Sequence, residues 1–446
     1  MKPKCLKSGD KVAIVSLSSG VLGESFVKHE IDLAEARLRE YGLQPVYMKN
    51  SLKGIDFLAN NPQARAQDLI DAFEDSDIKA IICAIGGNDT YKLAPYLMDN
   101  EAFINAVKNN PKIFTGFSDT TINHLMLNRL GLNTFYGPNY LCDLAELDTD
   151  MLPYTKAWFE LYMGKLQEQI VSSDVWYKER TDFSPNAVGT SRISNKETKG
   201  FEVLQGSGIK EGKLFGGCID SLHELVFGDI EKTQINNKYK LFPSKEELNG
   251  KILFLETSDS KMQSQKLEQV LNDFAKIGVF DAVSAIIVGK PQDEVFYEEY
   301  KDVFKKVFQG VDLPILYNVN FGHAVPRCVI PYNINTQIDF DKKTITFLEP
   351  IFEQDTVVNN TKRENMKELV KALVDKYTDL SKDNAFVWIG DVIIYYDKEG
   401  KRVDDKIGFY DYECINYLFD LKSQEYIDIY QKNLHTIVEK AEKKDK

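Results

Sequence analysis

The first part of the chain alternates between continuous apolar runs and segments whose apolar residues recur at helical spacing. The apolar runs predict buried strands at 11–17, 44–48, 78–87 and 112–118. The helical spacing predicts helices at 31–41, 61–74, 91–97 and 120–129. Strands without polar alternation that are separated by helices indicate a parallel sheet covered on both faces. The N-terminal part is therefore expected to be an α/β domain.

A second set of patterns follows a polar stretch. Residues 172–208 contain few apolar runs, so they form either a long ordered loop or a linker. Beyond them, strands are predicted at 251–257, 284–291 and 314–323, a helix at 263–280, and a hairpin at 336–350. After residue 361, the pattern predicts helices at 364–380 and 423–446 and two strands within 386–405.

These patterns divide the chain into four parts, since 446 residues are too many for one ordinary core. We expect an N-terminal α/β domain at 1–165 and a long loop or linker at 166–212. A smaller β-rich domain is expected at 213–358. The last part, 359–446, is expected to be an accessory α+β extension.

Charge and composition narrow the classes of protein. A net charge of −13 opposes binding to the phosphate backbone of nucleic acids. No run of about 18 apolar residues occurs, so no membrane span is expected, and the apolar stretch from Val12 is too short for a signal peptide. The six cysteines are scattered, which is typical of reduced thiols in the cytoplasm. The histidines do not cluster with them, so no metal site is expected.

Ser118 follows an apolar strand and precedes a helix that begins near Thr120. A nucleophile on such a strand-to-helix turn presents its hydroxyl at the carboxyl edge of the sheet, beside backbone N–H groups of the helix. The hydrolase pattern Gly-x-Ser-x-Gly is half met, because Gly116 is present and Thr120 replaces the second glycine. The plainer alternative is that Ser118 caps the helix.

Glu256 and His323 also stand at the ends of predicted strands. A serine hydroxyl needs a base to take its proton, and that base needs a carboxylate to fix its tautomer and steady its charge. Each residue alone has a plainer explanation, as a surface carboxylate or a structural histidine. Together with Ser118 they favour a Ser-His-Glu triad, and the chain order Ser, Glu, His is also that of α/β-hydrolases.

Glycines end the strand predicted at 78–87. The N–H groups of Gly86 and Gly87 can face an oxyanion, with Asn88 as a substrate contact, or these are plain turn residues. A nucleotide phosphate loop is disfavoured, because neither G-x-G-x-x-G nor G-K-[ST] is present.

Serines at the first strand end and one tryptophan are further candidates. Ser16, Ser18 and Ser19 either bind polar groups of a ligand or cap the next helix. Trp176 lies in the polar stretch, where it either stacks on a planar substrate group or anchors the loop.

Five segments, AIGGND, GFSDTT, the FGG segment at 215–217, FLETSD and NFGHAVP, resemble in this order the serine peptidases that comprise LD-carboxypeptidases and microcin C immunity proteins. The resemblance covers about residues 3 to 350. It implies a flavodoxin-like N-terminal domain with a parallel sheet, a smaller β-rich C-terminal domain, and a site between them. The segment from 361 on has no counterpart in it.

The resemblance also implies roles for individual residues. Ser118 is implied to be the nucleophile, His323 the general base and then acid, and Glu256 the group that orients His323. The backbone N–H groups of Gly87 and Asp119 are implied to form the oxyanion hole. Neither a metal nor an organic cofactor is expected, and a homodimer is favoured.

Two substrate classes divide this family. LD-carboxypeptidases remove the terminal D-alanine from a cytoplasmic tetrapeptide in cell-wall recycling, and immunity proteins cleave the amide between an acidic aminoacyl group and a nucleotide-like moiety. The loop with Trp176 and the segments FLETSD and NVNFGHAVP resemble the immunity branch. We therefore expect a hydrolase of a small amide next to a free carboxylate, with a small peptide or an aminoacyl nucleotide as substrate. Cys218 departs from the pattern, because asparagine is expected after Gly217.

A function of another class is a ligand-binding or sensor protein that has the same fold and no turnover. The additional C-terminal segment motivates this hypothesis. The presence of Ser118, Glu256 and His323 together opposes it.

Overall fold

The computed structural model describes residues 1–165, 167–353, 384–389, 392–397 and 402–409. It divides into two compact units, Met1–Glu353 and Gln354–Lys446. Within the described ranges, every helix is too short or too polar to cross a membrane.

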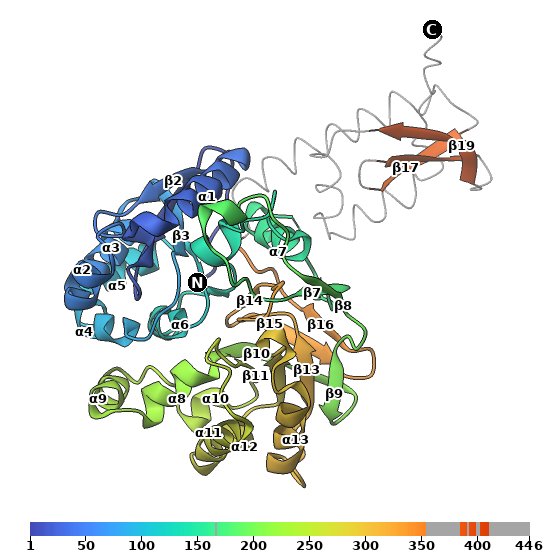
Figure 1. Cartoon of the computed structure of the whole chain (residues 1–446). Helices are drawn as coiled ribbons and strands as arrows, with labels where there is room; N and C mark the ends of the chain where they lie inside the picture. The colour runs from blue at the N-terminus through green and yellow to red at the C-terminus, as the bar shows by residue number, and fades with distance from the viewer. Residues whose placement is uncertain (166, 354–383, 390–391, 398–401, 410–446) are drawn as a thin grey trace. The chain divides into compact units, whose positions relative to one another are not determined.

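The first sheet of the larger unit has six strands in the order β14-β5-β4-β3-β1-β2 (Figure 1). Five of them are parallel and follow the flavodoxin-like order 2-1-3-4-5, and β14 pairs antiparallel at the edge. The strands are β1 Lys11–Val15, β2 Gln44–Tyr47, β3 Ile78–Cys83, β4 Ile113–Gly116, β5 Phe135–Tyr136 and β14 Ile330–Pro331. The predicted parallel sheet of the N-terminal part is thereby confirmed.

Helices cover both faces of this sheet, because successive side chains of a strand point to opposite sides. Ala13 and Val15 of β1 share one hydrophobic cluster with α3, α5 and α6, and Val12 and Ile14 share a second with α1 and α7. The helices are α1 Lys28–Glu40, α2 Ile55–Asn60, α3 Pro62–Glu74, α4 Ala94–Leu97, α5 Glu101–Asn109, α6 Thr120–Arg129 and α7 Pro153–Phe159. The short α4 continues a 3₁₀ turn at Thr90–Leu93.

The second sheet has eight strands in the order β6-β16-β15-β10-β11-β12-β13-β9. Its central strands β10 to β13 are parallel, and the strands on either side are antiparallel to their neighbours. The strands are β6 Gln169–Ile170, β9 Glu202–Gln205, β10 Ile209–Cys218, β11 Ile252–Glu256, β12 Ala285–Gly289, β13 Ile315–Val319, β15 Asn335–Asp339 and β16 Thr344–Phe347. The hairpin predicted at 336–350 is the β15–β16 pair.

One face of the second sheet is covered by helices that lie below β10, β11 and β13 in Figure 1. In α11, Leu267, Val270, Leu271 and Phe274 form the buried stripe, at the i, i+3, i+4, i+7 spacing of an amphipathic helix. The helices are α8 Ile219–Phe227, α9 Ile230–Tyr239, α10 Lys245–Leu248, α11 Ser264–Lys276, α12 Val279–Ala282 and α13 Tyr297–Val307. Both hydrophobic clusters contain residues of both sheets, so the two sheets share their core.

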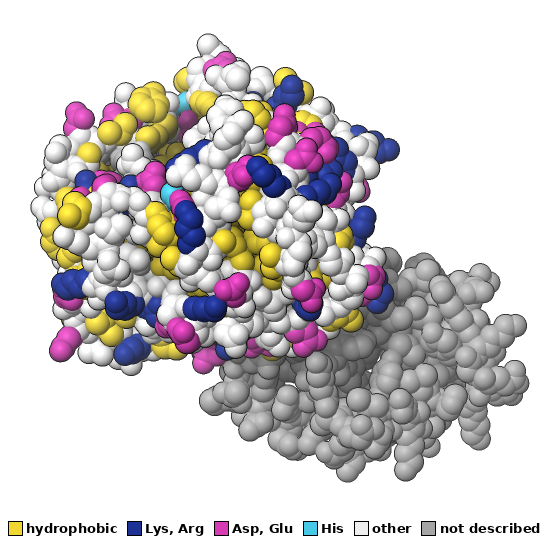
Figure 2. All heavy atoms as spheres, turned by 90° about the horizontal axis from the view of Figure 1, so that it is seen from below, with side chains coloured by type: hydrophobic (Ala, Val, Ile, Leu, Met, Phe, Trp, Pro, Cys, Tyr) yellow, Lys and Arg dark blue, Asp and Glu magenta, His cyan; other side chains and the backbone are white. Residues whose placement is uncertain are grey.

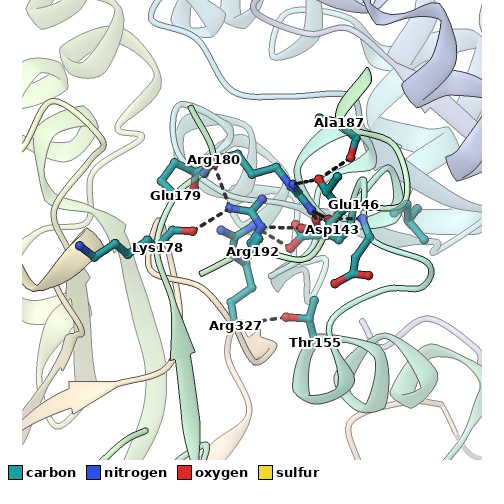
Figure 3. A network of polar contacts seen from close by, with 12 residues as sticks. Asp143, Glu146, Thr155, Lys178, Glu179, Arg180, Ala187, Arg192 and Arg327 are labelled. Atoms are coloured by element: carbon teal, nitrogen blue, oxygen red, sulfur yellow. Dashed lines mark hydrogen bonds and ion pairs between the residues drawn. The ribbon is translucent and has the colours of Figure 1, made fainter. Parts of the chain in front are cut away.

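The polar segment before β10 forms a loop with secondary structure of its own. Strands β7 Val175–Tyr177 and β8 Ser194–Lys196 pair antiparallel, and the N–H of Tyr177 donates to Val325 O at 2.8 Å. Figure 3 shows the ion pairs that hold this loop, in which Arg180 and Arg192 both contact the buried Glu146. Paired and hydrogen-bonded charges of this kind are the form in which buried charges occur in proteins. The loop is therefore tied to the body of the unit at β7 and through Arg180 and Arg192, which lie between its two strands.

The smaller unit contains three antiparallel strands, β17 Asn384–Ile389, β18 Val392–Asp397 and β19 Arg402–Phe409. The sequence prediction of two strands in this region was wrong. The apolar run of 386–396 is interrupted by Gly390 and Asp391, and Ile389 pairs with Val392 across them. The helices predicted at 364–380 and 423–446 lie outside the described residues.

The surface mixes charges of both signs. In Figure 2, Lys and Arg side chains are interspersed with Asp and Glu on the face seen from below, with apolar side chains between them. The most exposed large apolar residues of the described part, Ile230, Ile193 and Phe26, belong to three separate segments.

Candidate active site

Ser118 lies in the three-residue turn 117–119 between β4 and α6, as its position in the sequence predicts. Its φ of 68° is in the left-handed region, which residues other than glycine seldom adopt. A strained backbone of this kind is typical of nucleophiles that lie on the turn between a strand and a helix. The turn brings the Ser118 Oγ to 3.1 Å from Nε2 of His323.

Gly86 makes room for this turn. A Cβ at position 86 would lie 2.6 Å from Cβ of Ser118 and 2.8 Å from its Oγ, closer than carbon atoms approach in proteins. The approach of Ser118 therefore requires a glycine at position 86, and a Cβ at Gly87 would instead lie 2.2 Å from the Oγ of Ser18, so both glycines are more than plain turn residues.

His323 lies in the loop after β13 and is buried. Its Nδ1 is 2.8 Å from Oε2 of Glu256, and its backbone N–H donates to the same oxygen at 3.2 Å. Phe117 packs edge-on against the imidazole with ring centroids 5.1 Å apart. Burial opposes the charged imidazolium, but the charge of Glu256 and the hydrogen bond to it outweigh burial and raise the pKa of His323 above its ordinary value. A carboxylate on Nδ1 leaves Nε2 free to accept a proton from Ser118.

Glu256 is the last residue of β11 and is 2% exposed. Its Oε2 faces His323, and its Oε1 accepts a hydrogen bond of 2.5 Å from the hydroxyl of Tyr136. Gly322 adopts a φ of 79°, and a Cβ there would lie 2.3 Å from Cγ of Glu256. The glycine before His323 therefore permits the close approach of the carboxylate.

Asp119 follows Ser118 in the sequence, and Gly87 lies in the loop after β3, next to the Gly86 that packs against Ser118. Their backbone N–H groups have no hydrogen-bond acceptor among the described residues. The N–H of Ser118 itself donates to the Tyr136 hydroxyl at 3.1 Å. Both N–H groups that the family resemblance assigns to an oxyanion hole are thus without an acceptor among the described residues.

The side chain of Asp119 has a structural role that the sequence did not show. Its buried carboxylate accepts from the Ser18 hydroxyl at 2.6 Å and from the Thr90 N–H at 2.9 Å. Burial raises the pKa of Asp119. Ser18 thus holds the turn after Ser118 in place. This role differs from the two that the sequence suggested for Ser18, a helix cap and a ligand contact.

Asn88 lines a pocket with Tyr91, Asp119, Ser221 and Lys232.

Trp176 lies on β7 and is partly exposed. It makes no hydrogen bond or ring contact with Ser118, Glu256 or His323, all of which belong to the described residues. Its strand is joined through Tyr177 to Val325, two residues beyond His323. The ammonium of Lys290 lies 5.0 Å from the centre of its ring and pairs with Glu197 at 3.0 Å. The indole is thereby held in place near the loop that carries His323.

Tyr136 and Arg327 are residues of the site that sequence reasoning missed. Arg327 pairs with Asp143 at 2.7 Å (Figure 3). Its guanidinium lies 4.3 Å from the centre of the Phe117 ring. Tyr136 ends β5, a two-residue strand too short to produce an apolar run. Its position at the end of the segment TFY, directly before Gly137-Pro138, is the signal that could have identified it.

The remaining histidines of the described part have structural contacts. Nε2 of His124 lies 2.9 Å from Gly116 O, and burial lowers the pKa of this residue to about 3. His223 pairs with Asp273 at 3.0 Å. Among the described residues, no group of three or more His, Cys, Asp or Glu side chains is arranged to hold a metal ion.

Two family models match the chain. The LD-carboxypeptidase N-terminal domain matches residues 12–137, and the LD-carboxypeptidase C-terminal domain matches residues 211–338. The first range contains Ser118, and the second contains Glu256 and His323.

Proteins of known structure and curated relatives are similar to this chain over most of their own lengths. An MccF-like protein from Streptococcus pneumoniae in complex with AMP is 46% identical, with a TM-score of 0.73 over 76% of this chain and 98% of that chain. The microcin C7 self-immunity protein MccF of Escherichia coli is 29% identical over 70% of this chain and 86% of its own. A structure of MccF in complex with aspartyl sulfamoyl adenosine is 25% identical, with a TM-score of 0.65 over 79% of this chain and 100% of that chain. A probable murein peptide carboxypeptidase of Bacillus subtilis is 27% identical over 77% of this chain and 93% of its own.

Proposed function

The chain belongs to the LD-carboxypeptidase family of serine peptidases, and we propose that its Ser118, His323 and Glu256 act together to hydrolyse a small amide next to a free carboxylate. The observation that carries this proposal is the unbroken chain of contacts from Ser118 Oγ through the imidazole to Glu256, at 3.1 Å and 2.8 Å. Both distances are within the reach of a hydrogen bond, as proton transfer requires.

In the proposed reaction, Nε2 of His323 accepts the Ser118 proton as Oγ attacks the carbonyl carbon of the amide. Glu256 holds the imidazole by Nδ1 and balances the charge that His323 acquires. The imidazolium then protonates the leaving nitrogen, which gives an acyl-enzyme and a free amine. Water attacks the acyl group with His323 again as base, and releases the acid and Ser118.

The N–H groups of Gly87 and Asp119 are proposed to bind the oxyanion of the tetrahedral intermediate. Both lack an acceptor within the described chain, while the neighbouring N–H of Ser118 is bonded to Tyr136. Donors held ready where negative charge develops stabilise the transition state without reorganisation.

The substrate is proposed to be an acidic aminoacyl group joined to a nucleotide-like moiety. Support comes from the 46% identity to the MccF-like protein bound to AMP, and from the partly exposed indole that Lys290 holds on the loop beside His323. The alternative is a muropeptide, as for the murein peptide carboxypeptidase that is 27% identical. A homodimer and a cytoplasmic location stay predictions.

Side-by-side hydrolysis of aspartyl sulfamoyl adenosine and an L,D-tetrapeptide ending in D-alanine tests this proposal. We expect kcat/KM for the first substrate to exceed that for the second by at least about tenfold, the contribution of one stacked base. The blank is the Ser118→Ala protein. Cleavage of the tetrapeptide alone would make the protein a muropeptide carboxypeptidase. Cleavage of neither would instead favour the ligand-binding hypothesis.

Trp176→Ala is expected to raise KM for aspartyl sulfamoyl adenosine about tenfold and to leave the tetrapeptide nearly unaffected, because stacking on an aromatic ring is worth about 1–3 kcal/mol per base. Trp176→Phe, which keeps a smaller ring on the same strand, is the matched variant and should lose less. Steady-state kinetics on both substrates provides the measurement. An equal loss on both substrates would assign Trp176 to anchoring the loop.

A further inference from the structure

Tyr136 connects two of the three residues in the proposed catalytic group. Its hydroxyl lies 3.1 Å from the backbone nitrogen of Ser118 and 2.5 Å from Oε1 of Glu256. These three residues belong to β5, the turn after β4 and the end of β11, so the contacts join both sheets. Tyr136 is fully buried, and its ring packs against Phe254 and Phe321.

The chemistry of the three groups fixes the direction of both hydrogen bonds. A backbone N–H only donates, so the Tyr136 oxygen accepts from Ser118, and its own proton points to Glu256. Burial and the neighbouring Glu256 carboxylate raise the pKa of Tyr136 well above its ordinary value. The phenol therefore keeps its proton and stays a donor to Glu256 at every pH at which His323 titrates.

We propose that Tyr136 is a positioning residue for the reaction, which fixes the Ser118 turn by accepting its N–H and fixes the Glu256 carboxylate by donating to Oε1. This inference rests on the proposed function of Ser118, His323 and Glu256. Tyr136 is fully buried and its hydroxyl is bonded to the Ser118 backbone and to Glu256, so it acts through the two residues that it holds.

Two consequences follow from these contacts. The bond to Ser118 supports a backbone conformation that a serine seldom adopts, with φ at 68°. The bond to Oε1 occupies one carboxylate oxygen and leaves Oε2 for the backbone N–H and the ring of His323. Without the hydroxyl, the partly buried N–H of Ser118 and a buried carboxylate oxygen of Glu256 would both lose their partner.

Tyr136→Phe removes only the hydroxyl. We expect kcat for aspartyl sulfamoyl adenosine to fall about 10- to 100-fold, as leaving buried polar groups unpaired implies, with KM little changed. The matched control is Tyr162→Phe. Tyr162 is also fully buried and beside β5, but its hydroxyl donates to Thr115 Oγ1 at 2.8 Å, away from the three residues. This control should keep its kcat.

The pH profile separates positioning from a merely structural role. The charged groups that bear on His323 are Glu256, Asp220, Asp259 and Arg327. Losing the Tyr136 donor leaves more of the Glu256 charge to act on His323, which raises the pKa of His323 further. Since His323 must be neutral to act as base, the acid limb of kcat/KM should move to higher pH in Tyr136→Phe and stay in place in Tyr162→Phe.

A second variant covers the case in which Tyr136→Phe does not fold. Incorporation of 3-fluorotyrosine at position 136 keeps the hydroxyl and makes it a stronger donor, so the acid limb should move to lower pH. The inference would be overturned if the acid limb of kcat/KM did not move in either variant of Tyr136. It would also be overturned if Tyr162→Phe lost as much kcat as Tyr136→Phe. The wild-type protein is measured in the same assay, and an inactive wild type would instead count against the proposed function.

Discussion

Replacing Ser118 by alanine is expected to lower kcat for the cleaved substrate by about 10⁴- to 10⁶-fold, the range found when a serine nucleophile is removed. The variant keeps the fold, because among the described residues the Ser118 side chain is bonded only to His323, while its backbone holds the turn through Tyr136 and Thr121. KM should change little. Single-turnover hydrolysis with purified protein is the measurement, and covalent labelling by a fluorophosphonate should be lost in parallel.

Ser16→Ala is the matched control for this loss. Ser16 also follows a parallel strand of the first sheet, and its buried hydroxyl donates to Ser51 O at 2.9 Å, outside the site. The control should hydrolyse at the wild-type rate. Undiminished hydrolysis by Ser118→Ala would falsify the assignment of Ser118 as nucleophile.

Replacing Glu256 by glutamine should lower kcat about 10³- to 10⁴-fold, because the neutral amide neither fixes the tautomer of His323 nor balances its charge. The change also has a signature in pH. The charge of Glu256 and the hydrogen bond to it raise the pKa of His323 against the effect of burial, so their removal lowers that pKa. Since activity is lost as His323 becomes protonated, the acid limb of kcat/KM should move to lower pH.

Asp259→Asn is the control for the loss of a negative charge beside His323. Its carboxylate lies 3.9 Å from Nε2 of His323 but is 75% exposed, so solvent screens it. We expect Asp259→Asn to have a small effect on kcat and on the pH of the acid limb of kcat/KM. A loss in Asp259→Asn as large as in Glu256→Gln would show that Asp259 is the partner of His323 in solution, and would overturn the role of Glu256.

Strands β1 to β4 and β11 to β13, the β15–β16 hairpin, and helices α1, α3, α6 and α11 could be predicted from local patterns. Helix α6 occupies Thr120–Arg129, as expected, because an apolar strand and a glycine before it and helix-forming residues within it leave few other conformations. The region 386–405 was predicted less well, because a two-residue interruption in an apolar run is easily missed. The roles of Trp176 and Asn88 stay predictions, since both lie at the periphery of the contacts that hold Ser118.

The candidate site was predictable where each residue ends a strand. Ser118, Glu256 and His323 each follow an apolar run, and such positions collect at the carboxyl edge of a parallel sheet. Ser118 follows a strand of the first sheet, and Glu256 and His323 lie at the ends of parallel strands of the second. Tyr136 was not predictable in this way, because β5 has two residues and leaves no pattern. The carboxylate of Asp119 was likewise assigned no role, although it binds Ser18 at 2.6 Å.

The sequence by itself determined the class of fold, the strand ends that carry polar chemistry and the membership in a family of serine peptidases. The tertiary structure decided which strand ends meet: His323 lies 205 positions from Ser118 and 67 from Glu256, and Tyr136 lies 120 from Glu256. Hydrophobic periodicity is a property of a few neighbouring residues, and it reports which face of an element is buried. The contacts of the site depend instead on strand order in two sheets and on how those sheets share a core, which no local pattern encodes.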